Sequence, residues 1–276
     1  MVQTTTYPGA QTSMITFGDR VKAFLAVPEE GTGPFPAMIL SHERYGLVQH
    51  TLDLAAKFAR YGYVGIAPDL FSHWEGDQEA LIRGDARVTI SDYEIKTFLS
   101  AGFDFLANDP RVDASKISSM GVCQSGEYPI VLNSVRPNLA ANIVVYGGAQ
   151  AGLWDVGELR LEPYIDIIKR ITAPVLGIWG ESDHVVSTEA VRNLRNALES
   201  EMKTYEFKLF RDMPHGWFND TMPGRYRPKE TAEAWDLIMD FLDRVHNGAF
   251  PKDRVTWKFD SDIAADYDFT KAVRLE

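Results

Sequence analysis

The sequence alternates short apolar runs with longer amphipathic segments over most of its length, and this alternation constrains the fold more than any other feature. The runs Ala37–Ser41 and Val64–Pro68 are typical of buried parallel strands, and apolar residues recur at helical spacing in Leu52–Tyr61 between them. Strands and helices in this order form βαβ units. The pattern therefore predicts an α/β fold whose central sheet is mostly parallel and has helices on both faces.

An antiparallel hairpin is predicted near the N-terminus, where Ser13–Phe17 and Val21–Val27 flank a Gly-Asp-Arg turn. The chain continues with predicted strands at 117–122, 142–146, 174–179 and 205–210 and predicted helices at 93–107, 188–198 and 230–245. These elements fit one domain over residues 1–248. Residues 249–276 hold one strand-like segment, 254–259, and we predict an extension that packs on the domain or on a partner subunit of a homo-oligomer.

The composition excludes several classes of protein. With 45% hydrophobic and 24% charged residues, the chain is typical of a soluble globular protein. Its formal net charge of -11 opposes nucleic-acid binding, which needs a basic face. No apolar run approaches the roughly 20 residues that span a bilayer. The first residues lack the pattern of a signal peptide, and a single cysteine forms no internal disulfide, so a cytoplasmic location is expected.

That cysteine lies where a predicted strand meets a predicted helix start, in the segment Met-Gly-Val-Cys-Gln-Ser-Gly at 120–126. A thiol framed by small residues at such a junction has the form of a nucleophile elbow, the sharp turn that exposes a reactive side chain above an α/β sheet. The alternative is that Cys123 is an inert buried hydrophobe, as free cysteines often are. A catalytic cysteine needs a base and an orienting acid elsewhere in the chain.

Both partners are present in the order expected for a hydrolase sheet, which is nucleophile, acid, histidine. Asp183 follows the strand 174–179, at the sheet edge where active sites of open α/β folds collect. His215 follows the strand 205–210, in a loop between Pro and Gly. Alternatively, Asp183 could cap the helix that begins near Ser187, and His215 could be a solvated loop residue. The agreement of order and strand context favours a Cys123, Asp183 and His215 triad.

An acyl-transfer site also needs hydrogen-bond donors for the developing oxyanion. We predict the backbone amides of Gln124, next to the nucleophile, and of Arg44, after the first parallel strand. His42 could line the same pocket. The sequence has no metal-binding motif, and we expect neither a metal nor another cofactor.

In these motifs the chain resembles the dienelactone hydrolase family of α/β-hydrolases, which use a Cys-Asp-His triad. The similarity covers roughly residues 15–246, and the cysteine elbow is its most specific part. The resemblance implies the α/β-hydrolase fold and carries the catalytic roles to Cys123, Asp183 and His215. It also implies that Glu43 contacts the resting thiol and that the thiol is activated when substrate binds, because a nearby carboxylate disfavours a thiolate. A structural pairing of Glu43 with Arg44 or a cap residue is the alternative.

The chain departs from the family pattern at two positions. Ser125 stands where glycine is common, although serine is also small. Asn219 stands where dienelactone-specific enzymes have an arginine that binds the substrate carboxylate. Arginines that could compensate, and aromatic residues that could form the pocket, are Arg44, Arg83, Arg87, Arg225, Arg227, Tyr45, Trp154, Trp217 and Phe218.

The lead hypothesis is a hydrolase of a small-molecule lactone or carboxylic ester that works through an acyl-enzyme on Cys123. An esterase or thioesterase for a non-lactone, aromatic substrate is the alternative, motivated by Asn219. A third hypothesis, from a different functional class, is a non-catalytic binding protein on a hydrolase scaffold, because a fold alone does not determine a function.

Overall fold

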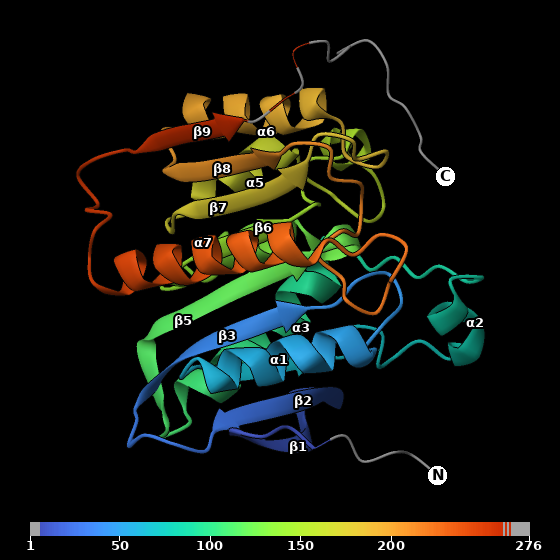
Figure 1. Cartoon of the computed structure of the whole chain (residues 1–276), viewed down its shortest axis with the longest axis vertical. Helices are drawn as coiled ribbons and strands as arrows, with labels where there is room; N and C mark the ends of the chain where they lie inside the picture. The colour runs from blue at the N-terminus through green and yellow to red at the C-terminus, as the bar shows by residue number, and fades with distance from the viewer. Residues whose placement is uncertain (1–5, 262, 264, 266–276) are drawn as a thin grey trace.

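The computed structural model describes residues 6–261, 263 and 265, and within them one nine-stranded sheet runs through the molecule (Figure 1). Its strand order is β1-β2-β4-β3-β5-β6-β7-β8-β9. The strands are β1 (Ala10–Phe17), β2 (Val21–Pro28), β3 (Phe35–Ser41), β4 (Val64–Pro68), β5 (Val112–Val122), β6 (Asn142–Val145), β7 (Val175–Gly180), β8 (Tyr205–Phe210) and β9 (Trp257–Ser261).

The sheet is parallel from β4 to β9 and antiparallel at its N-terminal edge, where β1 pairs with β2 and β2 with β4. The central strands are buried along almost their whole length, as expected for a parallel sheet covered on both faces. The predicted α/β class, with its parallel sheet and antiparallel hairpin, is therefore confirmed.

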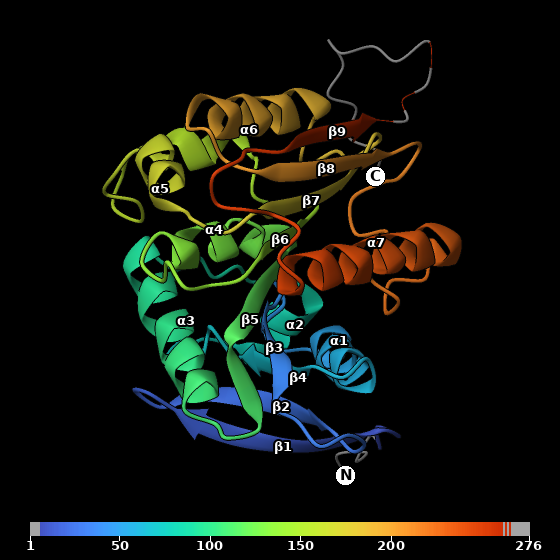
Figure 2. The same cartoon turned by 90° about the vertical axis from the view of Figure 1, so that its left-hand side faces the viewer.

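Helices cover both faces of the sheet. Figure 2 shows α1 and α7 on one face and α3, α4, α5 and α6 on the other. The α-helices are α1 (Gln49–Arg60), α2 (Gln78–Arg83), α3 (Asp92–Ala107), α4 (Tyr128–Asn133), α5 (Tyr164–Arg170), α6 (Thr188–Ser200) and α7 (Pro228–His246), and short 3-10 turns lie at Cys123–Ser125 and Ala151–Trp154. The closing helix α7 buries a stripe of apolar residues at helical spacing: Ala234, Trp235, Ile238, Phe241 and Leu242.

Sequence periodicity located every long helix but missed two short ones, α2 and α5. Helix α2 has six residues and buries only Leu81, so it has too few turns to show an apolar stripe. It projects from the body of the molecule in Figure 1. The helix expected directly after Cys123 begins instead as a 3-10 turn, and α4 follows it.

The strand-like segment of the C-terminal extension is part of the main sheet. Strand β9 pairs with β8 in parallel, and the indole of Trp257 donates to the carbonyl oxygen of Lys203 at 2.9 Å. The ammonium of Lys208 pairs with Asp260 at 3.0 Å. These contacts attach residues 257–261 to the chain's own domain. Most positions beyond 261 lie outside the described residues. Residues 1–5, on which the prediction about a signal peptide partly rests, also lie outside them. A partner interface stays a prediction.

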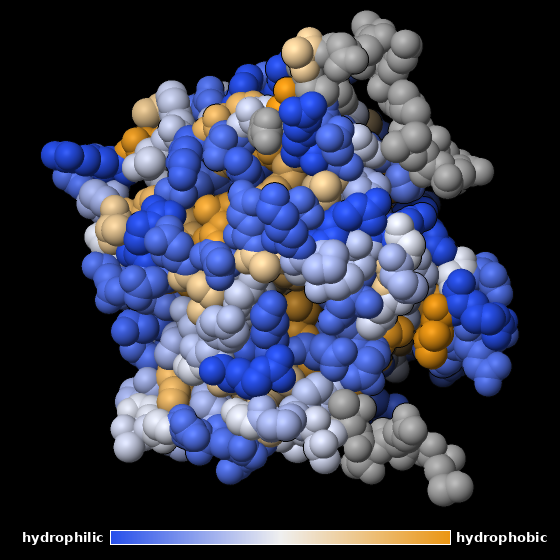
Figure 3. All heavy atoms as spheres, in the orientation of Figure 1, coloured by the Kyte–Doolittle hydropathy of each residue, from blue (hydrophilic) through white to orange (hydrophobic). Residues whose placement is uncertain are grey.

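The molecular surface is mainly hydrophilic on the face shown in Figure 3, with scattered apolar patches that include one on the projecting α2 segment. In the described part of the chain, no helix has both the length and the apolar character needed to cross a membrane.

The close packing of the turn after β5 against the end of β6 depends on glycine. A Cβ atom on Gly147, just after β6, would lie 2.0 Å from the carbonyl oxygen of Cys123, and one on Gly121 would lie 2.0 Å from that of Ser125. Real Cβ contacts are never this short, and the opposing atoms belong to the backbone. The turn that carries Cys123 therefore fits only because its neighbours have no side chain.

We predict that Gly147→Ala lowers the free energy of unfolding by about 2 kcal/mol or more, because overpacking must displace backbone. Chemical denaturation measures this change. Gly224→Ala is the control, since a Cβ there meets nothing within 4 Å, and its effect should stay within about 0.5 kcal/mol. Equal effects of the two substitutions would contradict the close approach.

Candidate active site

Parallel strands bring their carboxyl ends to one edge of the sheet, and the candidate residues gather there. Glu43 follows β3, Cys123 follows β5, Tyr146 follows β6, and Asp183 and His215 follow β7 and β8. Figure 1 shows the arrowheads of these strands at the same side of the molecule. This is the edge at which open α/β sheets bind ligands.

Cys123 has the backbone geometry of an elbow. Its φ of 60° lies in the left-handed region, which is unusual for a residue with a side chain. The hydroxyl of Ser125 stabilises the turn, because it accepts from the amide of Val122 at 3.0 Å and donates to the carbonyl oxygen of Ser41 at 2.9 Å. Ser125 is 1% exposed, so serine fits the position where the family commonly has glycine and also ties the elbow to β3.

The three residues singled out from the sequence form a continuous hydrogen-bonded line. His215 Nε2 lies 3.1 Å from the Sγ of Cys123, and His215 Nδ1 lies 2.8 Å from Oδ2 of Asp183. Both His215 and Asp183 are buried, at 5% and 7% exposure, whereas Cys123 is half-buried. The thiol therefore faces accessible space while its partners are shielded from water.

Asp183 is held in place by the loop that carries it. Its Oδ1 accepts from the amides of Val185 at 2.7 Å and Val186 at 2.9 Å, which leaves Oδ2 for His215. Helix α6 is capped instead by Ser187, whose hydroxyl accepts from the amide of Ala190. The alternative that Asp183 serves as the cap of this helix does not apply.

Electrostatics in this hydrogen-bonded line stabilise the imidazolium that His215 forms when it accepts a proton. Burial lowers the pKa of His215, but hydrogen bonds and charge interactions with Asp183 and Cys123 outweigh burial and raise it to about 10. The ring of Tyr146 also packs edge-on against His215, with 4.9 Å between the ring centroids. The imidazole is thus fixed in position and prepared to hold a proton.

Glu43 is buried beside this line, and both of its carboxylate oxygens are engaged. Oε1 accepts from the hydroxyl of Tyr146 at 3.0 Å, and Oε2 accepts from the side-chain amide of Asn219. The amide orientation of Asn219 is set by Thr221, whose backbone and hydroxyl both donate to Asn219 Oδ1. Glu43 therefore pairs with neither Arg44 nor a helix cap, and Asn219 acts as its partner.

His42 supports the loop after β3 from behind. Its Nε2 accepts from the amide of Leu70 at 3.1 Å, so the proton lies on Nδ1, which donates to the carbonyl oxygen of Glu43 at 2.7 Å. Burial lowers the pKa of His42, which keeps the ring neutral. His42 is 2% exposed and is not among the residues that line the cavity of Cys123.

A cavity of about 510 Å³ opens above Cys123 and carries three arginines, Arg44, Arg87 and Arg225. Arg44 is held by a hydrogen bond to the carbonyl oxygen of Gly84 and by the ring of Tyr45, with 5.0 Å from guanidinium carbon to ring centroid. The cavity is lined by Glu43, Arg44, Tyr45, Arg87, Cys123, His184, Val185, His215, Gly216, Met222 and Arg225. Its cationic lining suits a substrate with a carboxylate.

Other predicted contacts lie elsewhere. Arg83 is on the surface, paired with Asp85 at 2.9 Å. Trp217 is completely buried and packs on Phe210, so it is a core residue. Trp154 packs on the ring of Tyr164 and is not a lining residue of the Cys123 cavity. Sequence reasoning missed Tyr146, although its position at the carboxyl end of a predicted parallel strand was a usable signal.

In the described part of the chain, no group of three or more His, Cys, Asp or Glu side chains is arranged to hold a metal ion.

A buried acid, a histidine and a half-buried thiol on an elbow at the edge of a mostly parallel sheet define an α/β-hydrolase. Residues 21–246 match the model of the dienelactone hydrolase family, and the chain belongs to that family. It is a hydrolase of the dienelactone hydrolase type. This agrees with the resemblance found in the sequence.

Individual relatives are distant but cover most of the chain. A protein of Methylorubrum extorquens named "Putative carboxymethylenebutenolidase" is 25% identical over 80% of this chain and 76% of its own length. The crystal structure of a "Putative Dienelactone Hydrolase" from Klebsiella pneumoniae matches with a TM-score of 0.73 and 23% identity, covering 85% of this chain and 98% of its own. A dienelactone hydrolase-like promiscuous phosphotriesterase from metagenomic libraries has a TM-score of 0.70, 19% identity and coverage of 86% and 99%. These structural likenesses concern the fold.

We predict that Asp183→Asn lowers the pKa of His215 from about 10, because the substitution removes the carboxylate charge that favours the imidazolium. The raised pKa of His215 stabilises the folded chain fully below pH 6.5, and this contribution is lost as the pH rises to about 10. A ¹⁵N NMR titration of the histidine ring measures the pKa in both chains.

Asp212→Asn is the matched control, because Asp212 lies in the same loop as His215 with its side chain 71% exposed. The pKa of His215 should be the same in this variant as in the parent chain. Titration of His215 near 6.5 in the parent chain would contradict the assignment.

Proposed function

We propose that this chain hydrolyses a small-molecule lactone or carboxylic ester through an acyl-enzyme on Cys123. The observation that carries the proposal is the line Cys123, His215, Asp183, with contacts of 3.1 Å and 2.8 Å. The 3.1 Å contact joins a thiol to a base, and the 2.8 Å contact joins that base to an orienting carboxylate, which is the arrangement that nucleophilic catalysis requires. Membership of the dienelactone hydrolase family supports the same chemistry.

In the first half of the reaction, His215 Nε2 takes the proton of the Cys123 thiol, and the sulfur attacks the carbonyl carbon of the substrate. The negative charge moves to the carbonyl oxygen, where the backbone amides of Arg44 and Gln124 would donate to it. The tetrahedral intermediate then collapses, the C–O bond to the alcohol breaks, and His215 returns its proton to the leaving oxygen. In a lactone, the released hydroxyl stays attached to the acyl group.

In the second half, His215 removes a proton from water, and the hydroxide attacks the thioester carbonyl. The C–S bond breaks, the acid leaves, and the proton on His215 returns to sulfur. Asp183 holds Nδ1 throughout and stabilises the imidazolium.

Glu43 lines the same cavity as Cys123, and a carboxylate there disfavours a thiolate before substrate arrives. Its hydrogen bonds with Tyr146 and Asn219 hold the carboxylate at this position. We infer that the thiol is activated when substrate binding changes this local balance of charge, as the family resemblance implies.

The proposed substrate carries a carboxylate that the arginines of the Cys123 cavity bind. Arg44, Arg87 and Arg225 outnumber the acidic Glu43 among the residues that line it. A second candidate substrate is an ester or thioester that has no carboxylate. Asn219 favours this second candidate. That residue replaces the family's arginine and is itself bound to Glu43.

Replacing the nucleophile tests the proposal. We predict that Cys123→Ala lowers kcat/KM for lactones and aryl esters by at least about 10³-fold, because the covalent route is lost. Hydrolysis by a folded Cys123→Ala chain at the parent rate would refute Cys123 as the nucleophile.

Alkylation of the single cysteine distinguishes an enzyme from a binding protein on the same scaffold. Because Glu43 disfavours the resting thiolate, the reaction with iodoacetamide is compared between the parent chain and Glu43→Gln. Faster, pH-dependent alkylation in Glu43→Gln supports a thiol that can be activated, and reactivity that is equal in both chains and no greater than that of a free thiol supports the binding protein.

A pair of arginine substitutions tests whether the cavity above Cys123 binds a carboxylate of the substrate. We predict that Arg87→Leu lowers the preference for a carboxylate-bearing lactone over a neutral lactone by about tenfold, because a charged hydrogen bond is lost. The ratio of the two kcat/KM values measures this preference. Arg83→Leu is the matched control, since Arg83 lies outside the cavity and pairs with Asp85. An unchanged ratio in Arg87→Leu would favour the substrate without a carboxylate.

A further inference from the structure

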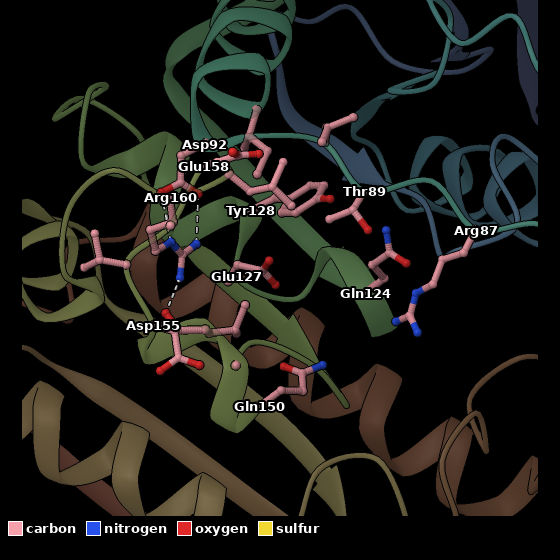
Figure 4. A pocket seen from close by; sticks show the side chains of 17 residues that line it. Arg87, Thr89, Asp92, Gln124, Glu127, Tyr128, Gln150, Asp155, Glu158 and Arg160 are labelled. Atoms are coloured by element: carbon pink, nitrogen blue, oxygen red, sulfur yellow. Dashed lines mark hydrogen bonds and ion pairs between the residues drawn. The ribbon is translucent and has the colours of Figure 1, made fainter.

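A second cavity, of about 550 Å³, lies beside the cavity of Cys123. The two share Arg87 as a lining residue, and Gln124, which follows Cys123 directly, lines the second one. Figure 4 shows Arg87 and Gln124 at one side of it and Arg160 at the other. Its apolar lining residues are Ile90, Ile95, Leu153, Val156 and Leu159, supplied by helix α3 and by the connections before α3 and before α5.

Glu127 is the most unusual residue in this cavity. It is 6% exposed, and its Oε2 has no hydrogen-bond partner among the described residues. In Figure 4 its carboxyl group points into the cavity between Gln124 and Arg160. Within the same described part of the chain, Oε1 of Gln124 is also buried and without a partner. Buried polar atoms are rarely left without partners, so two of them in one cavity point to a ligand.

The nearby arginine does not pair with Glu127. Arg160 donates two hydrogen bonds to Asp92, both at 2.9 Å, and a third to the carbonyl oxygen of Leu153 at 2.7 Å. These bonds hold the segment before α5 against the start of α3. The positive charge of Arg160 is therefore paired with Asp92. Burial raises the pKa of Glu127 to about 7, because its effect outweighs a backbone hydrogen bond and the charge of Arg160, which both lower the pKa, and Asp92 adds a smaller effect in the raising direction.

The charges of the cavity select among ligands. Asp92 and Arg160 neutralise each other, which leaves three acidic lining groups, Glu127, Asp155 and Glu158, and one cation, Arg87, on the side shared with the Cys123 cavity. A carboxylate is therefore disfavoured inside, in contrast to the arginine-rich cavity above Cys123. A hydroxyl can donate to Glu127 when the side chain is ionised and accept from it when it is protonated.

We propose that this second cavity binds the acyl arm of the substrate and selects an apolar arm that ends in a hydroxyl group, which hydrogen-bonds to Glu127. The proposal rests on the proposed function, since it places the acyl carbonyl at Cys123 and the arm beside Gln124. The substrate class is thus a lactone or ester whose acid part is apolar and hydroxylated. The carboxylate, where there is one, lies on the side of Cys123.

The test measures binding without turnover. Methyl esters of phenylalkanoic acids with one, two or three methylene groups, each with and without a para-hydroxyl group, are titrated calorimetrically into the Cys123→Ala chain. For the spacer that reaches Glu127, the hydroxylated ester should bind about tenfold more tightly, as expected for one added hydrogen bond. In Cys123→Ala/Glu127→Leu this preference should disappear, and in Cys123→Ala/Glu127→Gln, which keeps hydrogen-bonding atoms, much of it should remain.

Glu189→Leu on the same background is the control, because it makes the same chemical change on an exposed residue of α6. The hydroxyl preference should survive it. Equal affinities for every ester pair, no measurable binding of any ester, or a preference that persists in Glu127→Leu would overturn the proposal. Hydrolysis of these esters by the Cys123→Ala chain would instead refute the proposed function, and the binding preference would still decide the role of Glu127.

Discussion

The site depends on the positive φ of Cys123. A residue with a side chain occupies this region of backbone space only when its surroundings hold it there. Two glycines, Gly121 and Gly147, allow the neighbouring strands to approach the turn within distances that any Cβ would prevent. The hydroxyl of Ser125 then ties the turn to β3. The direction of the thiol, and with it the contact with His215, follows from this packing.

Near the elbow, the buried carboxylates of Asp183 and Glu43 have different hydrogen-bond partners, which divides their roles. Asp183 uses one oxygen for its own loop and the other for His215, and Glu43 uses its two oxygens for Tyr146 and Asn219. Burying an ionised carboxylate is costly unless such partners are present. The two acids can therefore lie near one thiol while only Asp183 contacts the imidazole.

The fold and the Cys123, Asp183 and His215 positions could be predicted because both follow from local patterns. Parallel strands are visible as apolar runs, and their carboxyl ends meet at one edge, so residues just after them are brought together. Long-range partners leave no such pattern. Tyr146 contacts Glu43 across 103 residues, and most of the cavity around Glu127 is lined by the connections before α3 and before α5, which have no apolar periodicity. The hydrogen bond between Asn219 and Glu43 joins residues 176 positions apart, so the sequence around Asn219 shows only that the family's arginine is absent there.

The central claim is that the sulfur of Cys123 becomes acylated during turnover. Rapid mixing with p-nitrophenyl acetate, acid quenching and peptide mass spectrometry test it directly. We expect a burst of p-nitrophenol of about one equivalent per chain and an acetyl group on the peptide that contains Cys123. Steady hydrolysis without a burst and without acetylation of Cys123, or an acetyl group on a different residue during turnover, would contradict it.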